Sequence, residues 1–347
     1  MSRFIVPPYL LAHLAEAGAD RFARAPEAAR RGLTQIAEVR AARSAAPPVR
    51  RGAVARGLEL ERTISDARGT EQLPGVRVRG EGEPAGDDVA VTEAYDALGA
   101  THALFSEVYG RSSIDGAGLP LDATVHYGHD YDNAFWNGER MVFGDGDGEV
   151  FRRFTASVSV IGHELAHGVT QYTANLEYQG QSGALNESVS DVFGALVEQH
   201  LFDQTADRAT WLIGEGLFTE AVQGRALRSM SAPGTAYDDD VLGKDPQPAH
   251  LDDYVETTDD AGGVHLNSGI PNRAFFLVAD ALGGRAWERA GQVWYDALVG
   301  GDVATTASFA DFARATVSAA TARSGAGSDE ARATVAGWRG VGVEPAA

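Results

Sequence analysis

The sequence predicts an α+β protein made of two lobes and an N-terminal appendage. Its 347 residues exceed one ordinary domain, and 44% of them are hydrophobic, enough to build sizeable cores. Strand-like signals dominate from about residue 58 to residue 148, whereas helical periodicity dominates beyond residue 159. We therefore expect residues 1–50 to form the appendage and its linker, residues 51–158 a β-rich lobe and residues 159–347 an α-helical lobe.

The sequence of the appendage predicts two helices and a tether. Residues 8–17 read as a short helix that stops at Gly18, and residues 26–43 read as a second helix. Residues 44–52 are small residues, prolines and arginines, a composition typical of exposed, extended chain that proteases cut. A simple tether between domains is the alternative. Residues 1–57 hold ten arginines and four acidic residues, a formal +6 within a chain of −20, so the remainder carries −26 and should attract them.

Composition excludes several classes of protein. The net charge of −20 argues against a nucleic-acid partner, whose phosphates would be repelled. No apolar run approaches the length of a membrane span, so we expect no membrane partner. The absence of cysteine leaves His, Asp and Glu as the ligands for any metal. Pro7 and Pro8 interrupt the early apolar run, which is unlike a signal peptide. We expect secretion by another route rather than permanent residence in the cytoplasm.

The β-rich lobe should contain one long helix and a hairpin. The helix is expected at residues 87–109. Asn137-Gly138 lies between two strand-like runs within residues 135–143, a strong hairpin signal. The edge strand of such a hairpin could pair with an extended substrate. The following segment, residues 144–148, faintly resembles a calcium loop but lacks the later spaced ligands, so a turn is the better interpretation.

A His-Glu-x-x-His motif opens the α-helical lobe at His163, Glu164 and His167. Because residues four apart share one helical face, both imidazoles can reach one metal ion. This spacing is the general zinc-metalloprotease signature, and zinc accepts two such nitrogens while leaving positions for a further ligand and a water. A chance match in a surface helix is the alternative.

A third ligand is expected in the helix that follows. Apolar residues give a helical period from Asn186 onward, which places Glu187 and Asp191 on one face, one turn apart. One carboxylate could then bind the metal while the other accepts the second ring N–H of a ligating histidine. A solvated acidic helix face is the alternative.

A second histidine, His265, lies on a Gly-rich, turn-like segment that begins at Asp260. The Asp260 carboxylate could orient and charge the imidazole, which could stabilise an oxyanion during peptide hydrolysis. A capping or surface histidine is the alternative. The next helix should begin near Pro271. Helices are expected at residues 272–282, 285–299 and 307–322.

These motifs resemble those of the thermolysin family of zinc endopeptidases, in the family's order, between about residues 58 and 343. The chain start, Val6-Pro7-Pro8-Tyr9-Leu10-Leu11, is similar to the Pro-Pro-Tyr motif of the short propeptide in the protealysin branch. The segments that carry the family resemblance are His163-Glu164-x-x-His167, Asn186-Glu187-Ser188-x-Ser190-Asp191, Asn133-Ala134-Phe135-Trp136-Asn137, Leu227-Arg228-Ser229-Met230 and Gly262-Gly263-Val264-His265-Leu266-Asn267-Ser268-Gly269.

The resemblance implies a two-lobe zincin with the zinc site between the lobes. One catalytic zinc would be bound by His163, His167 and Glu187. Glu164 would be the general base that activates the zinc-bound water and passes the proton to the leaving amine. The oxyanion would be stabilised by Tyr178 and His265, with Asp260 orienting His265. The ligand histidines would be oriented by Asp191 and Asn186. The substrate backbone would be contacted by Asn133, Ala134 and Arg228.

The resemblance also implies a preference for a large hydrophobic residue on the leaving-group side of the scissile bond. The matching pocket positions are Phe151, Phe154, Val160, Ile213 and Leu227. Each of these could equally be ordinary core. The family's double calcium site keeps Glu198 and Glu215, but the other expected acidic positions hold Ser159, Thr210 and Arg225, so calcium binding is doubtful. Ala261 replaces an expected asparagine beside His265.

The function expected is therefore that of a zinc endopeptidase acting on peptides and proteins, made as a self-processing zymogen whose own propeptide is its partner in cis. A non-catalytic binding protein on the same scaffold is one alternative. The presence of Glu164, Tyr178 and His265 argues against a binding protein, because a binding module needs none of them. An exopeptidase with a related zinc motif is the other alternative, but no site for a free substrate amine is evident.

Overall fold

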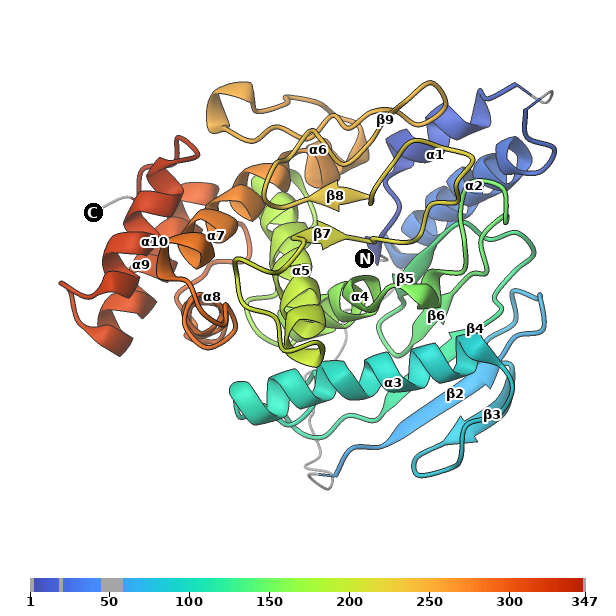
Figure 1. Cartoon of the computed structure of the whole chain (residues 1–347), viewed down its shortest axis with the longest axis horizontal. Helices are drawn as coiled ribbons and strands as arrows, with labels where there is room; N and C mark the ends of the chain where they lie inside the picture. The colour runs from blue at the N-terminus through green and yellow to red at the C-terminus, as the bar shows by residue number, and fades with distance from the viewer. Residues whose placement is uncertain (1–2, 19–20, 45–58, 346–347) are drawn as a thin grey trace.

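A six-stranded mixed sheet forms the β-containing part of the molecule (Figure 1). The structure, a computed structural model, describes residues 3–18, 21–44 and 59–345. Within these residues the strand order is β1-β5-β6-β4-β2-β3, with parallel pairs β2/β4 and β4/β6 and the other pairs antiparallel. The strands are β1 Arg3–Phe4, β2 Arg62–Asp66, β3 Val76–Gly80, β4 Leu121–Val125, β5 Ala134–Trp136 and β6 Met141–Phe143.

The predicted hairpin is confirmed as β5 and β6, joined by residues 137–140. The Asn137 carboxamide oxygen accepts the N–H groups of Glu139 and Arg140, each at 2.9 Å, and Gly138 has φ 103°, which favours glycine. Residues 144–148, expected as a turn, form irregular loop that bends from Gly148 onward. Its Asp147 carboxylate accepts three following backbone N–H groups.

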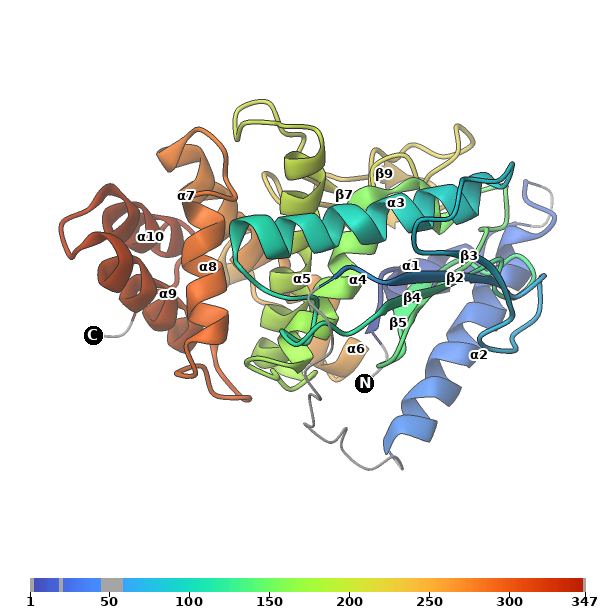
Figure 2. The same cartoon turned by 90° about the horizontal axis from the view of Figure 1, so that it is seen from below.

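The predicted helix at residues 87–109 is confirmed as α3 (Val89–Ala103), continued by one π-helical turn, η1 (Leu104–Val108). Asp88 caps α3, since its carboxylate accepts the Val91 N–H at 3.2 Å. The helix packs along the sheet against β2 and β4 (Figure 2). Its buried side chains therefore close one face of the β-containing part.

The second half of the chain is mainly helical. The helix expected from Asn186 onward begins earlier, at Gly180, and the one expected to start near Pro271 begins at Gly269. The helix expected at residues 285–299 starts only at Ala290, because Gly283 and Gly284 have positive φ and turns follow them. The helices are α4 Val158–Gln171, α5 Gly180–Leu201, α6 Asp260–Asn267, α7 Gly269–Leu282, α8 Ala290–Val299, α9 Phe309–Ser324 and α10 Asp329–Arg339.

Shorter elements connect this half. Helix α10 was not among the helices expected from the sequence; it consists mainly of small and charged residues. The remaining elements are η2 Phe154–Ala156, η3 Leu251–Asp253, the ribbon of β7 Leu212–Ile213 with β8 Arg228–Ser229, and the ribbon of β9 Asp238–Asp239 with β10 Gly243–Lys244.

The N-terminal segment folds against the rest of the molecule. Its two predicted helices are confirmed as α1 (Pro8–Ala15) and α2 (Ala25–Ser44), which pack on each other (Figure 1). Leu10, Leu11 and Leu14 of α1 are fully buried and belong to the same hydrophobic core as the sheet and helices. The predicted linker lies almost entirely outside the described residues, which resume at residue 59. Among the helices described, none is long and apolar enough to cross a membrane.

Candidate metal and active site

Helices α4 and α5 cross at two glycines, and this crossing positions the site. A Cβ on Gly162 would lie 3.1 Å from the Gly194 Cα, and a Cβ on Gly194 would lie only 2.4 Å from the Ser159 carbonyl oxygen. Side chains larger than hydrogen would therefore separate the two helices. Because the backbones approach so closely, the His163 and His167 side chains of α4 meet the Glu187 side chain of α5.

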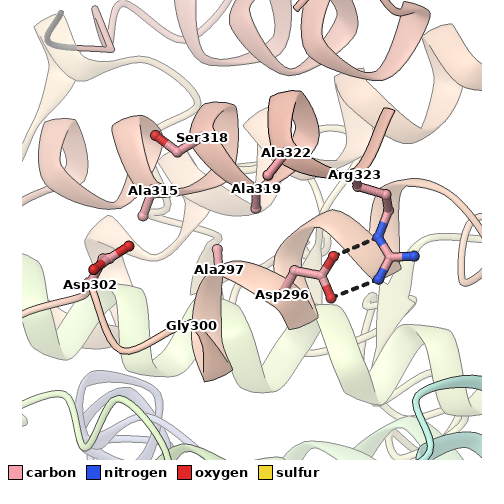
Figure 3. Close-up of a pocket in the computed structure, with 9 residues that line it drawn as sticks. All are labelled: Asp296, Ala297, Gly300, Asp302, Ala315, Ser318, Ala319, Ala322 and Arg323. Carbon is pink, nitrogen blue, oxygen red and sulfur yellow. Dashed lines mark hydrogen bonds and ion pairs between the residues drawn. The ribbon is translucent and has the colours of Figure 1, made fainter. Parts of the chain in front are cut away.

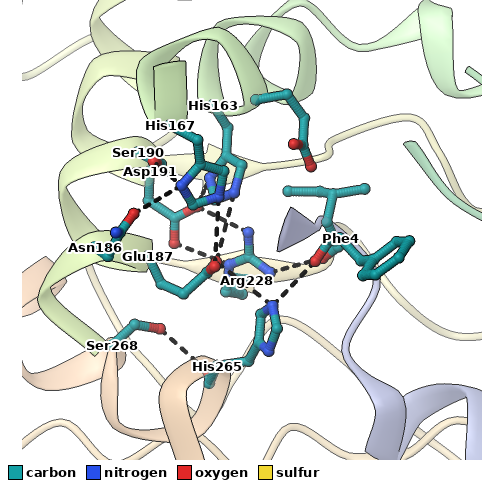
Figure 4. A network of polar contacts seen from close by, with 12 residues as sticks. Phe4, His163, His167, Asn186, Glu187, Ser190, Asp191, Arg228, His265 and Ser268 are labelled. Atoms are coloured by element: carbon teal, nitrogen blue, oxygen red, sulfur yellow. Dashed lines mark hydrogen bonds and ion pairs between the residues drawn. The ribbon is translucent and has the colours of Figure 1, made fainter. Parts of the chain in front are cut away.

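His163, His167 and Glu187 form a buried cluster, as the sequence predicts. One donor atom from each lies within 4.8 Å of the others, and among the described residues this is the group of three or more such side chains that could hold a metal. The Glu187 oxygens lie 3.5 Å from His163 Nε2 and 3.4 Å from His167 Nε2. Figure 4 shows the three side chains converging on one point between the helices.

Hydrogen bonds orient both imidazoles toward that point. His163 Nδ1 donates to Asp191 Oδ1 at 2.7 Å, and His167 Nδ1 donates to Asn186 Oδ1 at 2.9 Å. Each Nε2 is thereby the nitrogen that faces Glu187 and carries the lone pair. Asp191 thus lies where the sequence places it, one turn after Glu187 on the same helix, and Asn186 directly precedes Glu187.

The cluster fits a zinc ion. His163 Nε2 and Glu187 Oε2 are buried and make no hydrogen bond to any residue that the structure describes. Two neutral imidazole nitrogens and one carboxylate are a donor set that zinc accepts, with a further position left for water. Burial would raise the pKa of Glu187, but the neighbouring histidines, His265 first, hold this pKa well below its usual range. The carboxylate is therefore available as an anionic ligand.

Glu164 lies between the two histidines on α4 and is fully buried. Its Oε2 accepts the backbone N–H of Trp136 in strand β5 at 2.9 Å. This hydrogen bond connects the helix that carries the histidines with β5, the strand on which β1 pairs.

The Gly-rich segment before His265 is a left-handed turn, confirming the predicted rigid turn. Residues 260–263 all have positive φ, between 48° and 82°, and right-handed helix resumes at Val264. Ala261, with φ 53°, adopts this conformation at a steric cost that glycine avoids. The turn brings the Asp260 carboxylate back to His265, where Oδ2 accepts the backbone N–H at 2.9 Å and Oδ1 accepts Nδ1–H at 2.8 Å.

Both ring nitrogens of His265 face acceptor oxygens. Nδ1 faces the Asp260 carboxylate, and Nε2 lies 3.0 Å from the Phe4 carbonyl oxygen. Both oxygens can only accept, so both nitrogens donate. Burial lowers the pKa of His265, but Asp260 and then Glu187 outweigh it and raise the pKa. Tyr178 joins the group, because its hydroxyl donates to Glu187 and lies 3.2 Å from His265 Nε2.

Arg228 and Asn133 hold the backbone of the N-terminal segment in this site. Arg228 Nη1 donates to the Ile5 carbonyl at 3.1 Å, and Asn133 Oδ1 accepts the Val6 N–H at 3.0 Å. The Ala134 carbonyl accepts the Ile5 N–H at 3.2 Å. The three residues that the sequence marks as substrate contacts therefore all contact the extended backbone of the chain itself.

The five apolar positions expected to form a pocket are all buried in one core cluster, to which Ile5 also belongs. The rings of Phe151 and Phe154 lie 5.5 Å apart, and the Leu227 N–H donates to the Ile213 carbonyl at 2.9 Å across β7 and β8. Val160 lies on α4, one turn before Glu164.

Sequence reasoning missed three polar residues of the site. Ser190 Oγ lies 2.8 Å from His167 Nδ1, and the one-turn spacing from Asn186 could have indicated this. Asn272 donates to Asp191 Oδ2 at 2.8 Å, and Gln247 donates to the His265 carbonyl at 2.7 Å. No local pattern identifies Asn272 or Gln247, since each comes from a distant segment.

A separate cavity of about 510 Å³ lies between α8 and α9 (Figure 3). The bidentate Asp296–Arg323 ion pair closes one side of it, with oxygen–nitrogen distances of 2.5 and 2.9 Å, and the rest is lined mainly by small residues. It contains no His and only one acidic residue beyond this pair. The chemistry is therefore better supported at the histidine cluster.

The comparisons with known proteins agree with this geometry. The family model "Thermolysin metallopeptidase, catalytic domain" matches residues 64–171, and "Thermolysin metallopeptidase, alpha-helical domain" matches residues 174–343. The chain is 50% identical over 319 residues to an extracellular metalloprotease of Pectobacterium carotovorum subsp. carotovorum, covering 92% of this chain and 90% of that protein.

Two further similarities extend the match. The chain is 52% identical over 287 residues to protease PrtS of Photorhabdus sp. (strain Az29), covering 82% of this chain and 77% of that protein. The solved precursor of protealysin, a metalloproteinase from Serratia proteamaculans, superimposes with a TM-score of 0.88 at 52% identity. That similarity covers 98% of this chain and 99% of that one.

Proposed function

The chain belongs to the thermolysin family of metallopeptidases, hydrolases of peptide bonds, and on that premise we propose that it is a zinc-dependent endopeptidase made as a self-processing zymogen. The observation that carries the proposal is the buried group of His163, His167 and Glu187, with the Glu164 carboxylate on the same helix. These three residues would hold zinc. When bound, zinc supplies a Lewis acid that polarises a substrate carbonyl and lowers the pKa of a water to near neutrality.

Glu164 would act as the general base. Its carboxylate, held by the Trp136 N–H, would take a proton from the attacking water and later deliver it to the leaving nitrogen. Asp191 and Asn186 would keep the ligand histidines in the tautomer whose Nε2 faces the metal.

His265 and Tyr178 would stabilise the negative charge that develops on the substrate carbonyl oxygen. The imidazolium is preorganised by Asp260, so its Nε2–H is already directed into the cleft before the charge appears. Tyr178 brings its hydroxyl beside the same nitrogen. The contribution of such donors lies mainly in the transition state.

Substrate would bind as an extra strand on β5. Asn133, Ala134 and Arg228 already contact the extended backbone of residues 5–6 in the way that a bound peptide requires. We propose that Phe151, Phe154, Val160, Ile213 and Leu227 form the pocket for a large hydrophobic residue on the leaving-group side. The match of the chain to both thermolysin family models across these positions supports this assignment.

We further propose that residues 1–50 form a propeptide and its linker, residues 51–158 the β-rich catalytic lobe and residues 159–347 the α-helical lobe that begins with the zinc helix. The hydrogen bonds of residues 4–6 to the site support an inhibitory propeptide. Action outside the cell is supported by the Pectobacterium relative, which is described as extracellular. We propose no calcium requirement, because Ser159 Oγ accepts the Gly214 N–H in place of an acidic ligand.

Elemental analysis of the purified full chain tests the metal site. Glu187→Gln should lower zinc content markedly, because a neutral amide is a poor zinc ligand. Glu177→Gln, an exposed change of the same kind, should leave zinc content unchanged. Casein zymography with and without a zinc chelator tests the activity. Proteolysis that persists unchanged after the chelator has removed the zinc would refute a zinc endopeptidase.

A further inference from the structure

The first described residues of the chain lie in the site as an extended strand. β1 pairs antiparallel with β5, in a register that sets Arg3 opposite Trp136 and Phe4 opposite Phe135. Phe4 is 2% exposed and Ile5 is 0% exposed, so the segment is buried in the cleft rather than lying across its mouth. The Phe4 and Phe135 rings pack together, with centroids 5.4 Å apart.

The backbone of this strand is paired, group by group, with the residues assigned to catalysis and substrate binding. His265 Nε2 donates to the Phe4 carbonyl, Arg228 Nη1 donates to the Ile5 carbonyl, and the Ala134 carbonyl accepts the Ile5 N–H. Asn133 makes both contacts of Val6, accepting its N–H at 3.0 Å and donating Nδ2–H to its carbonyl at 3.4 Å.

These contacts identify one peptide bond. The carbonyl oxygen that accepts the hydrogen bond from His265 Nε2 is that of Phe4, so the oxyanion would be stabilised on this oxygen and the attacked carbon is the Phe4 carbonyl carbon (Figure 4). The groups on the carboxyl side of it, Ile5 and Val6, are held by the substrate-binding residues. Their N–H and carbonyl groups alternate in direction as those of a bound strand must.

We propose that residues 4–6 occupy the site in the register of a substrate and that the Phe4–Ile5 peptide bond is cleaved by the enzyme's own active site. The proposal rests on the proposed endopeptidase function. In the reaction, a C–O bond forms between the water oxygen and the Phe4 carbonyl carbon, and the Phe4 C–Ile5 N bond breaks. Glu164 transfers one water proton to the Ile5 nitrogen. The second water proton also passes to this nitrogen, so the products are a carboxylate at Phe4 and an ammonium group at Ile5.

Cleavage at this bond does not empty the site. The leaving-group side continues into α1 and α2, which remain docked through buried leucines of α1 and through Glu149, whose carboxylate accepts the N–H groups of Ala23, Arg24 and Ala25. The new amino terminus at Ile5 is therefore retained at a high effective concentration, about millimolar for a short tether. The nicked chain stays inhibited until the rest of the propeptide is removed.

Intact-mass analysis and N-terminal sequencing of the full chain over time test the cleavage. With zinc supplied, a species that begins at Ile5 should appear, together with a short peptide that ends at Phe4, and casein digestion should not yet rise. Ile5→Asp should slow this cleavage by roughly tenfold or more, because a carboxylate is poorly accommodated in a dry pocket. Ala12→Asp is the matched control, since it adds the same charge to an exposed position of α1 and should change nothing.

Amide hydrogen exchange tests the register without metal or activity. In zinc-free Glu164→Gln chain, the Ile5 and Val6 amides should be protected. Asn133→Ala should speed exchange at Val6 by roughly two- to tenfold, the effect of one lost hydrogen bond, while Ile5 keeps its bond to the Ala134 carbonyl. Unprotected amides at both residues, or cleavage at a neighbouring bond instead, would overturn the register. If the chain digests casein while its Phe4–Ile5 bond stays uncut, the proposed cleavage is overturned but the proposed function stands. If the zinc-loaded chain remains inactive on casein after the propeptide has been removed, the proposed function is overturned as well.

Discussion

Arg228 and Asp191 form a fully buried bidentate ion pair, with Nε–Oδ2 and Nη2–Oδ1 distances of 2.9 and 2.8 Å. Asp191 also accepts His163 Nδ1–H, and Arg228 also donates to the Ile5 carbonyl. One ion pair therefore connects the orientation of a histidine of the proposed metal site with the binding of a peptide backbone. The Arg228 guanidinium holds the pKa of the buried Asp191 at about 2, although burial alone would raise it.

Replacing Arg228 by Met should destabilise the full chain by about 3–5 kcal/mol, because the Asp191 carboxylate would remain buried without its cation. Arg228→Lys should cost less, since it keeps the charge but loses the two-pronged geometry. Urea unfolding measures the free energy of unfolding of both variants. Arg314→Met removes an exposed ion pair to Asp311 and should change stability by less than about 1 kcal/mol. Equal stability of the Arg228 and Arg314 variants would contradict this account.

Glu164→Gln should keep the fold and the zinc content while reducing peptide hydrolysis by about 10²–10⁴-fold, because it removes the base and leaves the ligands in place. The amide can still accept the Trp136 N–H, so β5 should not move. Elemental analysis and turnover of a peptide substrate are measured on the same preparation. Near wild-type turnover with full zinc occupancy would rule out Glu164 as the base.

Glu149→Ala should loosen the propeptide. The carboxylate accepts the N–H groups of Ala23, Arg24 and Ala25 at 3.2, 2.8 and 3.0 Å, at the start of α2. Loss of a helix cap commonly costs about 0.5–2 kcal/mol, so leakage activity of the uncut precursor should rise roughly two- to thirtyfold. Exposed Glu220→Ala is the control, and an unchanged precursor activity in Glu149→Ala would count against the cap.

Acid should also loosen the propeptide and raise the leakage activity of the uncut precursor. Burial would raise the pKa of Glu149, but the three N–H donors outweigh it and lower the pKa below its ordinary value of 4.5. A lowered pKa stabilises the docked state above that ordinary value, and the contribution is lost as the pH falls through the lowered pKa. Glu149→Ala should remove this contribution to the pH dependence of the leakage activity of the uncut precursor.

His126 should make stability fall at alkaline pH. Its ring nitrogens lie 2.8 Å from an Asp145 oxygen and 2.9 Å from an Asp88 oxygen. The hydrogen bond to Asp145 raises the pKa of His126 most, and the one to Asp88 adds to the rise. Burial opposes both, and the resulting pKa is about 9. The nearby Arg153 is engaged by Glu93. Because the pKa is raised, the stabilisation is complete below the ordinary value of 6.5 and lost as the pH rises through about 9.

The melting temperature of the full chain, measured across this interval, checks the prediction. His126→Asn should flatten its decline, and asparagine tolerates the positive φ of 53° at this position. His129→Asn, at a side chain that is 80% exposed, should leave the decline unchanged. An identical pH profile in the His126 variant would show that this histidine is not responsible.

Calcium should not raise the melting temperature. Ser159 Oγ accepts the Gly214 N–H at 3.2 Å, and burial raises the pKa of Glu198, with repulsion from Glu215 opposed by the Ser159 hydrogen bond. Fewer anionic oxygens weaken calcium binding. Ser159→Asp supplies one more anionic side chain and should therefore make the melting temperature depend on calcium. Magnesium should raise the melting temperature of this variant less. A calcium-dependent rise in the unchanged chain would contradict the expectation.

The local spacing of residues predicted the chemistry of the site better than the bounds of the helices. His163, His167 and Glu187 could be placed together because both helices follow a simple apolar period, and the Asn137-Gly138 signal located the edge hairpin. The start of α5 was placed six residues late, since Gly180–Leu185 contains glycines and small residues that weaken the period. The late start of α8 likewise depends on two left-handed glycines that a periodicity argument does not weigh.

Contacts between distant segments were beyond local reasoning. Asn272 reaches Asp191 across 81 residues, and the Phe4 carbonyl reaches His265 across 261. Such pairs are fixed by the packing of α7, α5 and β1 in three dimensions, and no spacing along the chain encodes them. The resemblance to a known family implied the roles of Arg228 and Asn133 and a propeptide in cis, whereas the register in which residues 4–6 meet them came from the structure alone.

The pairing of β1 with β5 also has a consequence for solubility. An open sheet edge presents unpaired N–H and carbonyl groups to any extended chain, including the edge of a second copy. An endopeptidase that binds substrate as a strand must expose such an edge in order to work, and it is then open to edge-to-edge aggregation. With β1 in place the β5 edge is paired, so the segment that we propose withholds activity would also keep the molecules apart while they accumulate.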